Sequence, residues 1–280
     1  MTPTRKILAW LFHLACIGHA PPSGPGDLAD VESSEASRTA DRLLGRLAPH
    51  VELRGKTVLD LGCGSGSTAI ALGQKGAARV LGVDIRPVEL ARGMLETEFA
   101  GLAGAVEFRQ IAADGSGLGD ERFDVVVSKD AFEHVADPAL HVRVIKDHLV
   151  DGGDVVIAFG PLWKSPWGSH LGFMTSVPWV HLAFPEEIML AERRRFRPWE
   201  GEISRLDDVP GGLNRMTLAR FESVMAASGL ECCRFEVDSV GSGRGGRLGK
   251  AVTLASRRPR LREYFAGYVF SLWRPRDRPV

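Results

Sequence analysis

Residues Val58–Gly66, with the sequence VLDLGCGSG, decide the fold. An apolar run carries the acidic residue Asp60, and glycines follow at alternating positions, Gly62, Gly64 and Gly66. Glycine permits a sharp turn and lets a ligand lie against the bare backbone. The N–H groups at the start of a following helix bind polar or anionic groups. The pattern predicts a strand, a ligand-binding turn and a helix, with Asp60 placed to attract a cationic end of the ligand.

Short apolar runs alternate with helical patterns on both sides of this turn. Such alternation predicts a parallel sheet with helices on both faces. The chain then continues into a helix and two strands around a glycine-rich loop, which predicts an antiparallel terminal hairpin. The fold class is therefore α/β, a Rossmann-like, seven-stranded and mostly parallel sheet. The predicted strands are 57–61, 79–84, 106–110, 123–128, 154–159, 231–237 and 251–255, and the predicted helices are 34–48, 68–75, 87–99, 138–149 and 217–228.

A long insertion interrupts the alternation at residues 161–213. It follows the fifth predicted strand, so it is expected to form a lid over the substrate. Its tryptophans either stack on an acceptor ring or form a small core of the insert itself. We predict three parts of the chain: an apolar segment and linker at 1–27, the main domain at 28–256 with its lid at 161–213, and a basic aromatic tail at 257–280.

Both ends of the chain leave alternatives open. The apolar run Ile7–Ile17 is too short to span a bilayer, for which about 20 residues are needed. It is read as a cleaved signal, as a helix packed on the domain or resting on a membrane surface, or as a loose arm. The tail is read as an aromatic helix over the sheet edge, or as a contact with a membrane or an anionic substrate.

Two more acidic residues follow predicted strands. Asp84 ends the second strand, and Asp114 comes after the third. A carboxylate at the end of the second strand can accept hydrogen bonds from both hydroxyls of a ribose. One after the third strand can accept from an adenine amino group. With Asp60, these residues lie at the carboxyl ends of neighbouring parallel strands, where open α/β sheets bind ligands.

Together these features resemble the class I S-adenosylmethionine-dependent methyltransferases, and particularly the small-molecule enzymes with a Glu-His-Val segment after the fourth strand, here Glu133–Val135. The resemblance implies that the glycine turn with Asp60 cradles S-adenosylmethionine. It also implies that Asp84 binds the ribose while Ile85 packs on the adenine. Asp114 then binds the adenine, and Ser128 lies near the methionine end. Residues 115–119 depart from the family pattern, because relatives carry an apolar pair there.

A different cofactor is weighed as well. Gly64, Gly66 and Ala69 fit the G-x-G-x-x-A pattern of dinucleotide-binding folds. Asp60 argues against that cofactor, because a carboxylate beside a pyrophosphate is repelled and one beside a sulfonium or an amino group is attracted. An NAD(P)-binding oxidoreductase and a non-catalytic S-adenosylmethionine-binding protein remain the alternatives.

For methyl transfer to a hydroxyl, the protein must position the acceptor and remove its proton. His170, in the insert, is the first candidate for the general base, and His134 is the second. Structural roles compete with catalysis at both positions. No metal site is predicted, because no His, Cys or Asp cluster has ligand spacing.

The composition narrows the class of partner. Lys and Arg together number 35, as do Asp and Glu, so no overall charge draws the chain to nucleic acid. Four cysteines without paired spacing indicate a reducing compartment. We therefore expect a cytoplasmic enzyme for O-methylation of a small molecule or glycan, with no nucleic-acid substrate and with membrane contact left open.

Overall fold

The computed structural model describes residues 2–21, 38–87, 90, 93–94, 97–98, 100–209, 212–240, 254, 256 and 258–276. Its centre is a seven-stranded sheet in the order β3-β2-β1-β4-β5-β7-β6. β3, β2, β1, β4 and β5 are parallel to one another, and β7 runs antiparallel to both β5 and β6. The strands are β1 Thr57–Leu61, β2 Arg79–Asp84, β3 Val106–Gln110, β4 Phe123–Lys129, β5 Leu149–Phe159, β6 Leu230–Ser239 and β7 Ala266–Pro275. The predicted α/β class and its terminal hairpin are confirmed.

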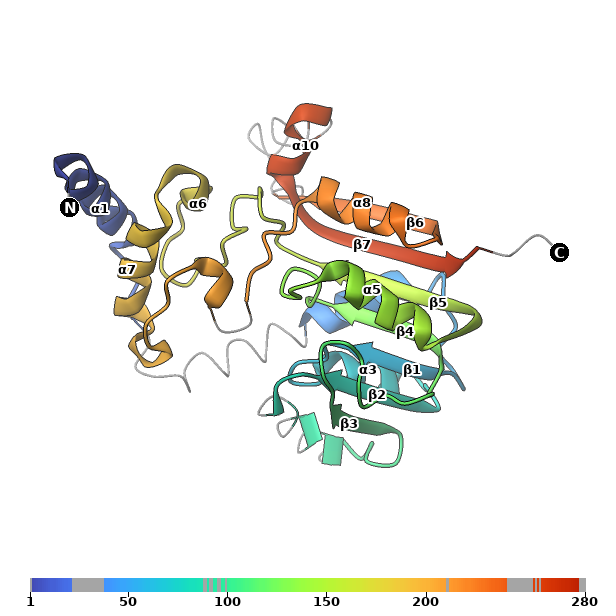
Figure 1. The fold of residues 1–280 in the computed structure, drawn as a ribbon. Helices are drawn as coiled ribbons and strands as arrows, with labels where there is room; N and C mark the ends of the chain where they lie inside the picture. Colours follow the sequence, from blue (N-terminus) through green and yellow to red (C-terminus); the bar gives the residue numbers. More distant parts are fainter. Residues whose placement is uncertain are drawn as a thin grey trace.

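Helices cover both faces of this sheet (Figure 1). α5 (Pro138–Asp147) and α8 (Leu218–Ala227) pack on one face, where Phe221 is fully buried. On the other face lie α3 (Ser67–Gln74) and a helix at residues 38–47, which buries Leu47. The sheet is thus apolar on both sides, as a parallel sheet between helices requires.

Local sequence fixes the start of the helices that flank the site. Asp137 accepts hydrogen bonds of 3.0 Å from the N–H groups of Ala139 and Leu140, and Pro138 occupies the first turn of α5. A side chain that caps the free N–H groups and a proline in the first turn both favour helix initiation. Thr217 caps α8 in the same way through the N–H of Arg220, at 3.2 Å.

The last strand lies later in the chain than the sequence predicted. A strand was expected at 251–255, of which 251–253 and 255 lie outside the described residues and residue 254 is helical. The observed strand is β7, so the prediction of a separate tail at 257–280, read as an aromatic helix, was wrong. Its residues alternate between the two apolar layers, with Val269 and Trp273 in one and Phe270 and Leu272 in the other. This period of two, buried on both faces, suits a central strand. Within the described part of 257–280, α10 (Pro259–Phe265) is the helical segment, and it precedes β7.

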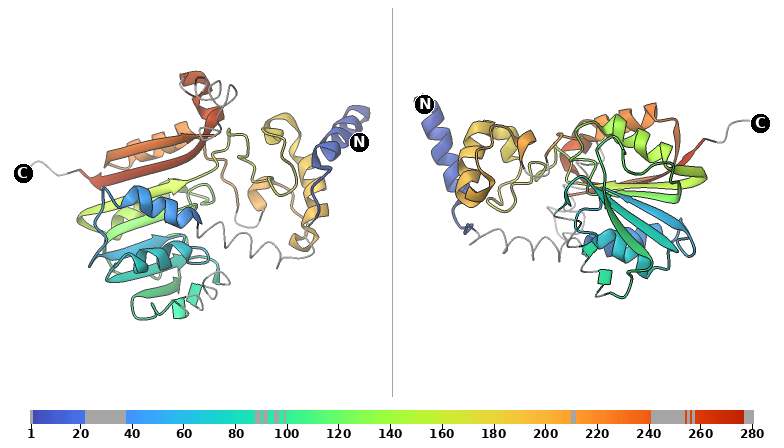
Figure 2. Two further views of the ribbon diagram at one scale, coloured as in Figure 1. Left: turned by 180° about the vertical axis from the view of Figure 1, so that it is seen from behind. Right: turned by 60° about the horizontal axis from the view of Figure 1, so that its bottom comes forward.

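The insert at 161–213 folds into a small unit beside the carboxyl ends of the parallel strands (Figures 1 and 2). The N-terminal helix α1 (Pro3–Cys16) packs on it, and Phe12 and Cys16 are buried in a core shared with the insert. α1 is therefore a helix packed on the domain, one of the alternatives left open. The helical elements of the insert are α6 Val180–Ala183, α7 Glu186–Phe196, η1 Pro198–Glu200 and η2 Leu206–Asp208.

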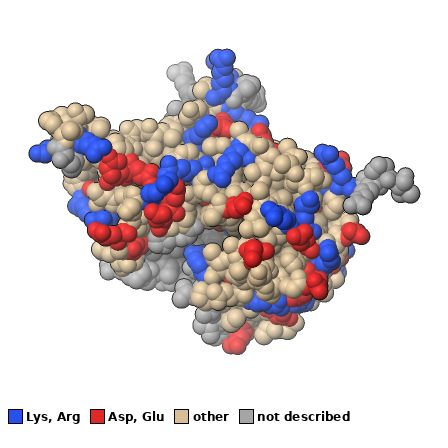
Figure 3. Space-filling model, in the orientation of Figure 1, with Lys and Arg blue, Asp and Glu red and all other residues tan. Residues whose placement is uncertain are grey.

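Charged side chains of both signs lie intermingled over the insert and the sheet domain on the face drawn in Figure 3. In the insert, the Arg193 side chain forms a 2.6 Å ion pair with Glu200 and lies over the ring of Phe173. The Arg193 side chain therefore contributes to packing within the insert. Across the described ranges, no helix has the length and apolar content to cross a membrane.

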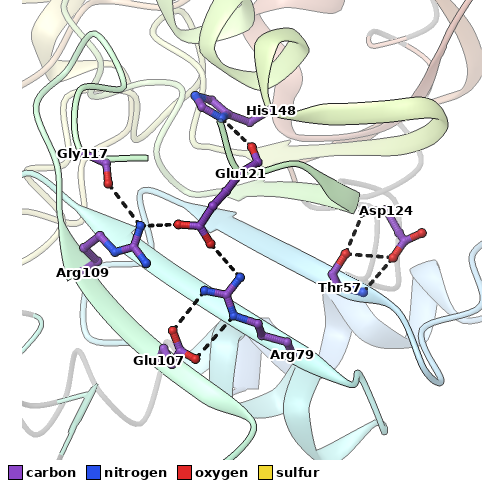
Figure 4. Close-up of polar contacts among 8 residues, drawn as sticks. All are labelled: Thr57, Arg79, Glu107, Arg109, Gly117, Glu121, Asp124 and His148. Atoms are coloured by element: carbon purple, nitrogen blue, oxygen red, sulfur yellow. Dashed lines mark hydrogen bonds and ion pairs between the residues drawn. The ribbon is translucent and has the colours of Figure 1, made fainter. Parts of the chain in front are cut away.

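A polar network joins the amino ends of the strands, opposite the glycine turn (Figure 4). Arg79, at the start of β2, pairs with Glu107 on β3 at 3.1 Å and with Glu121 at 2.7 Å. Arg109 donates to the same Glu121 carboxylate. The carboxylate of Asp124 on β4 accepts from the N–H of Thr57 at 2.9 Å. These contacts fix the register of β1 to β4, and so the relative positions of their carboxyl ends.

Candidate functional site

A pocket of about 600 Å³ lies at the carboxyl ends of the parallel strands. Its walls come from four places: the turn after β1, the end of β2, the segment after β3 and the segment after β4. The insert adds one residue, Gly212. The lining residues are Leu61, Gly62, Val83, Asp84, Ile85, Arg86, Ile111, Ala112, Ala113, Asp130, Ala131, His134, Val135, Ala136, Asp137, Leu140, His141 and Gly212.

The glycine turn after β1 adopts a backbone that only glycine takes without strain. Gly62, Gly64 and Gly66 have φ angles of 81°, 52° and 86°. A Cβ at Gly66 would lie 2.5 Å from the ring of Phe108, so the turn needs glycine there for packing. A Cβ at Gly64 would meet nothing within 4 Å. Gly64 therefore presents bare backbone to open space, as the sequence predicted for a ligand-binding turn.

Asp84, at the end of β2, bridges this turn and the pocket. Its Oδ2 accepts a 3.0 Å hydrogen bond from the Gly64 N–H, and its Oδ1 accepts one of 3.0 Å from the Arg86 N–H. The residue is 8% exposed and lines the pocket. Ile85, next in the chain, also lines the pocket and keeps 57% of its surface exposed. A carboxylate and an apolar side chain therefore stand side by side at the same wall.

Asp60 lies inside β1, 1% exposed, and neither of its carboxylate oxygens has a hydrogen-bond partner within 3.5 Å in the described structure, although the N–H of Ala69 is near enough to lower its pKa. Burial raises its pKa to about 7; Lys129 opposes this rise and Asp84 adds to it. A buried carboxylate without partners is costly, and a cationic group placed beside it offsets that cost. With the open backbone at Gly64, this unsatisfied carboxylate fits a ligand that carries positive charge at one end.

Two of the predicted cofactor residues point their side chains elsewhere. The Asp114 carboxylate is exposed and accepts from the N–H of Ser116 at 2.9 Å, while its neighbour Ala113 lines the pocket. The Ser128 hydroxyl is fully buried against Nε2 of His141, at 2.9 Å. Of the predicted set, Gly62, Asp84 and Ile85 line the pocket, and Asp60, Gly64 and Gly66 are in the same strand and turn but not in the lining.

The two predicted base candidates lie together. The rings of His134 and His170 meet edge to face, with centroids 5.2 Å apart. His134 lines the pocket, and its Nδ1 hydrogen-bonds to the carbonyl of Gly212 at 2.6 Å. His170 is set behind it, with φ of 56° and its pKa lowered to about 3, chiefly by burial and then by His134. Such a pKa makes His170 a weak proton acceptor.

Sequence reasoning missed the residues that complete the pocket wall. Asp130 follows β4 directly, has φ of 50°, and accepts from the Tyr268 hydroxyl at 2.8 Å and from the Lys129 ammonium. Its position at a strand end was a usable signal. His141 comes from the first turns of α5 and lines the pocket from a helix, so no strand-end pattern pointed to it.

A family model for a methyltransferase domain matches residues 33–234 of the chain. The chain is 37% identical over 107 residues to a ubiquinone biosynthesis O-methyltransferase of Stutzerimonas stutzeri, covering 38% of this chain and 45% of that relative. It is 34% identical over 124 residues to another with that name from Cereibacter sphaeroides, covering 44% and 48%. The chain thus spans about half the length of the curated relatives it matches.

Solved structures share the fold at low sequence identity. A magnesium protoporphyrin IX methyltransferase from Synechocystis, crystallised with bound SAH (S-adenosylhomocysteine), has a TM-score of 0.51 and 17% identity, covering 85% of this chain and 82% of that one. A [4+2]-cyclase has a TM-score of 0.53 and 18% identity, covering 97% and 95%. At these identities the likeness concerns the fold alone. The family model, however, spans well over half of the sequence, and the protein therefore belongs to the methyltransferase domain family.

Proposed function

We propose that the protein is an S-adenosylmethionine-dependent methyltransferase that methylates a hydroxyl oxygen of a small molecule. The observation that carries this proposal is the pair of carboxylates at adjacent strand ends, Asp60 without a partner and Asp84 on the pocket wall. The family match and the named O-methyltransferase relatives support the same reaction class.

The cofactor, when bound, supplies a methyl group on a positively charged sulfur, and the residues of this chain hold it in place. Asp84 receives the ribose hydroxyls, and Ile85 packs on the adenine. The backbone of Gly62 and Gly64 lies along the methionine part, and the Asp60 charge favours its cationic end. A hydrogen bond from the adenine amino group to Asp114 remains a prediction. Its neighbour Ala113 lines the pocket.

The acceptor side of the pocket is formed after β4. His134 lies on the wall there, and His170 backs it from the insert. We propose that His134 faces the acceptor hydroxyl and that His170, a weak proton acceptor, acts on it through His134. Ser128 takes an indirect role, since its hydroxyl holds His141 on the wall.

The class of acceptor is inferred from the insert. Two of its four tryptophans pack against other rings: the ring centroid of Trp163 lies 4.8 Å from that of His181, and that of Trp179 lies 5.7 Å from that of Phe265 in α10. Neither lines the pocket. This favours a compact small molecule over an extended glycan that stacks on several aromatic rings, and a glycan acceptor stays the second prediction.

Methyl transfer is tested by incubating the full chain with methyl-labelled S-adenosylmethionine and small-molecule extracts of cells. We expect label in an extractable product with the wild type, and much less with Asp84→Asn at a limiting concentration of the methyl donor. Asp151→Asn, an exposed acid outside the pocket lining, is the matched control and keeps the activity. Oxidation of a substrate with NAD, without label transfer, would instead support an oxidoreductase.

We also propose that the protein contacts a membrane surface through α1. The helix exposes large apolar side chains at helical spacing, among them Ile7 and Trp10, both 59% exposed. Lys6 directly precedes Ile7, whereas Arg5 pairs with Glu187 of α7 at 3.0 Å. A basic residue beside an exposed apolar helix face favours an anionic lipid surface. The other exposed apolar residues of this face are Leu11, Leu14 and Ile17.

Sedimentation with anionic vesicles tests this contact. The double variant Ile7→Ser, Trp10→Ser should bind vesicles on the order of tenfold more weakly than the wild type, because two large apolar side chains no longer enter the lipid. Leu182→Ser on α6, which removes a side chain 45% exposed, is the control and should change nothing. Equal sedimentation of both variants would exclude α1 as the contact. A cytoplasmic location stays a prediction.

A further inference from the structure

Three side chains from distant parts of the sequence meet beside the pocket. Glu133 and His134 follow β4, and His170 comes from the insert after β5. Each offers one oxygen or nitrogen atom, and these atoms all lie within 4.8 Å of one another. No metal-binding spacing is visible along the chain, because the insert must fold back to bring His170 to the other two.

One of the two carboxylate oxygens of Glu133 lacks a hydrogen-bond partner. The residue is 3% exposed, and its Oε1 accepts from the Gly160 N–H at 3.3 Å. Its Oε2 is buried without a hydrogen-bond partner in the described structure. Burial, and then the charge of Asp130, raise the pKa of Glu133 well above its ordinary value. A positive charge next to Oε2 would remove both penalties.

Hydrogen bonds to backbone carbonyls fix which nitrogen of each histidine carries the lone pair. Nδ1 of His134 donates to the Gly212 carbonyl at 2.6 Å. His170 hydrogen-bonds to the backbone of Pro161, and its Nε2 is buried without a hydrogen-bond partner. In both rings the proton therefore sits on Nδ1 and the lone pair on Nε2. Metal-binding histidines are commonly held in this way, with the other ring nitrogen donating to a carbonyl or carboxylate.

The His170 backbone is consistent with a positioned ligand. Its φ of 56° lies in the left-handed region, which non-glycine residues rarely adopt. Residues held in such conformations cluster at functional sites, where the surrounding structure enforces the geometry.

We propose that Glu133, His134 and His170 form a binding site for one divalent transition-metal cation, through Oε2 of the glutamate and Nε2 of each histidine. Bonds from zinc to such atoms measure about 2.0–2.2 Å, so ligand atoms on one cation stand roughly 3–4 Å apart. The observed spacing needs little movement to reach this. Two imidazoles and one carboxylate suit Zn²⁺, Mn²⁺, Fe²⁺ or Co²⁺ better than Mg²⁺, which prefers oxygen ligands.

The position of the site indicates its role. His134 belongs both to the cluster and to the pocket wall, so coordination positions not taken by the protein adjoin the acceptor space. A hydroxyl bound to such a cation has a lowered pKa and gives up its proton to water more readily. This role rests on the proposed function, since it requires an acceptor hydroxyl in the pocket. The cation site itself does not.

The test is a metal titration of the full chain, without a histidine tag and stripped with EDTA. Calorimetry with Zn²⁺, and absorption with Co²⁺ as a coloured probe, should show about one cation per chain. Glu133→Gln and His170→Ala should each weaken binding by on the order of tenfold or more. His148→Gln is the matched control: His148 is also buried, and its Nδ1 hydrogen-bonds to the Glu121 carbonyl. It should bind the cation like the wild type.

Absence of binding to the wild type, or equal binding by Glu133→Gln, would overturn the site. X-ray absorption of the Zn²⁺-loaded wild type provides a test that needs no variant: scattering from two imidazoles supports the site, and its absence rejects it. Binding of S-adenosylhomocysteine by the metal-free wild type is measured in parallel. Cofactor binding without metal binding rejects only the cation site, and metal binding without cofactor binding rejects the proposed function.

Discussion

Gly64 and Asp84 are joined by a 3.0 Å hydrogen bond from the backbone N–H of the first to Oδ2 of the second. This contact ties the turn after β1 to the carboxyl end of β2. It holds the Asp84 carboxylate at the pocket wall, and a Cβ at Gly64 itself would still meet nothing within 4 Å. The two sequence signals that first indicated a nucleoside site are therefore one connected structure.

Asp84→Asn should weaken binding of S-adenosylhomocysteine by about ten- to a hundredfold, because a hydrogen bond to a charged group contributes roughly 1.5–3 kcal/mol. The side chain keeps its size, so the fold should persist. Calorimetric titration measures the affinity. An unchanged affinity would remove Asp84 from the site.

Gly66→Ala should lower the free energy of unfolding by about 2 kcal/mol or more, because the new methyl group meets the Phe108 ring and φ is left-handed. Gly64→Ala meets no neighbour, so it should cost only about 1–2 kcal/mol for its left-handed φ. Urea unfolding separates the two. Gly64→Ala should weaken cofactor binding more than its stability loss suggests, since its methyl group enters the open space. Equal stability losses would contradict the packing role of Gly66.

Asp60 should make the ligand-free protein less stable as pH rises. Its folded-state pKa of about 7 lies above the ordinary 3.8, so the folded state binds the proton more tightly than the unfolded state does. The free energy of unfolding then falls between these two values, by about 3 kcal/mol from about pH 5 to about pH 8. Asp60→Asn should remove this part of the pH dependence. The measurement is urea unfolding of both proteins at the two pH values, and parallel curves would contradict it.

Ionisation of Asp60 should also set the pH dependence of cofactor binding, but here the affinity should increase as pH rises. The ammonium group at the amino-acid end of the ligand favours the ionised Asp60, so the affinity for S-adenosylhomocysteine should rise with pH up to about 7 and then level off. Calorimetry across this range reports the trend. In Asp60→Asn the rise should be absent; a rise of equal size in that variant would assign the effect to another group.

Glu121→Gln should destabilise the sheet by about 1 kcal/mol, because its carboxylate pairs with both Arg79 and Arg109 and the pairs are partly exposed. The loss should shrink in high salt, which screens such pairs. Urea unfolding at low and high salt is the measurement. Asp151→Asn, another acidic-to-amide change, is the control.

The parallel half of the sheet could be predicted because local sequence signals mark where these strands begin and end. β1, β2 and β3 begin and end at the predicted residues. The apolar runs of β1 and β2 end at Gly62 and Asp84. β7 could not be placed in this way. Its aromatic residues suit a helix or a strand alike, and pairing with β5 and β6 decides between them. That choice depends on contacts far apart in sequence.

In the candidate site, too, some features could be predicted from the sequence and others depend on contacts between distant residues. Which strand ends face the pocket followed from topology, so Asp84 was predicted in advance, and Ile85 followed from the family resemblance. Where a side chain turns depends on its neighbours, and Asp114 turns to the Ser116 N–H while Ser128 turns to His141. The meeting of Glu133 with His170 depends on how the insert folds, which no local pattern predicts.

The most direct test of the nucleoside site is calorimetric titration of the wild-type chain with S-adenosylhomocysteine, beside an identical titration with NAD. A nucleoside site built on Asp60, Asp84 and the glycine turn should bind about one S-adenosylhomocysteine per chain and no NAD. Saturable binding of NAD together with no heat from S-adenosylhomocysteine would contradict it.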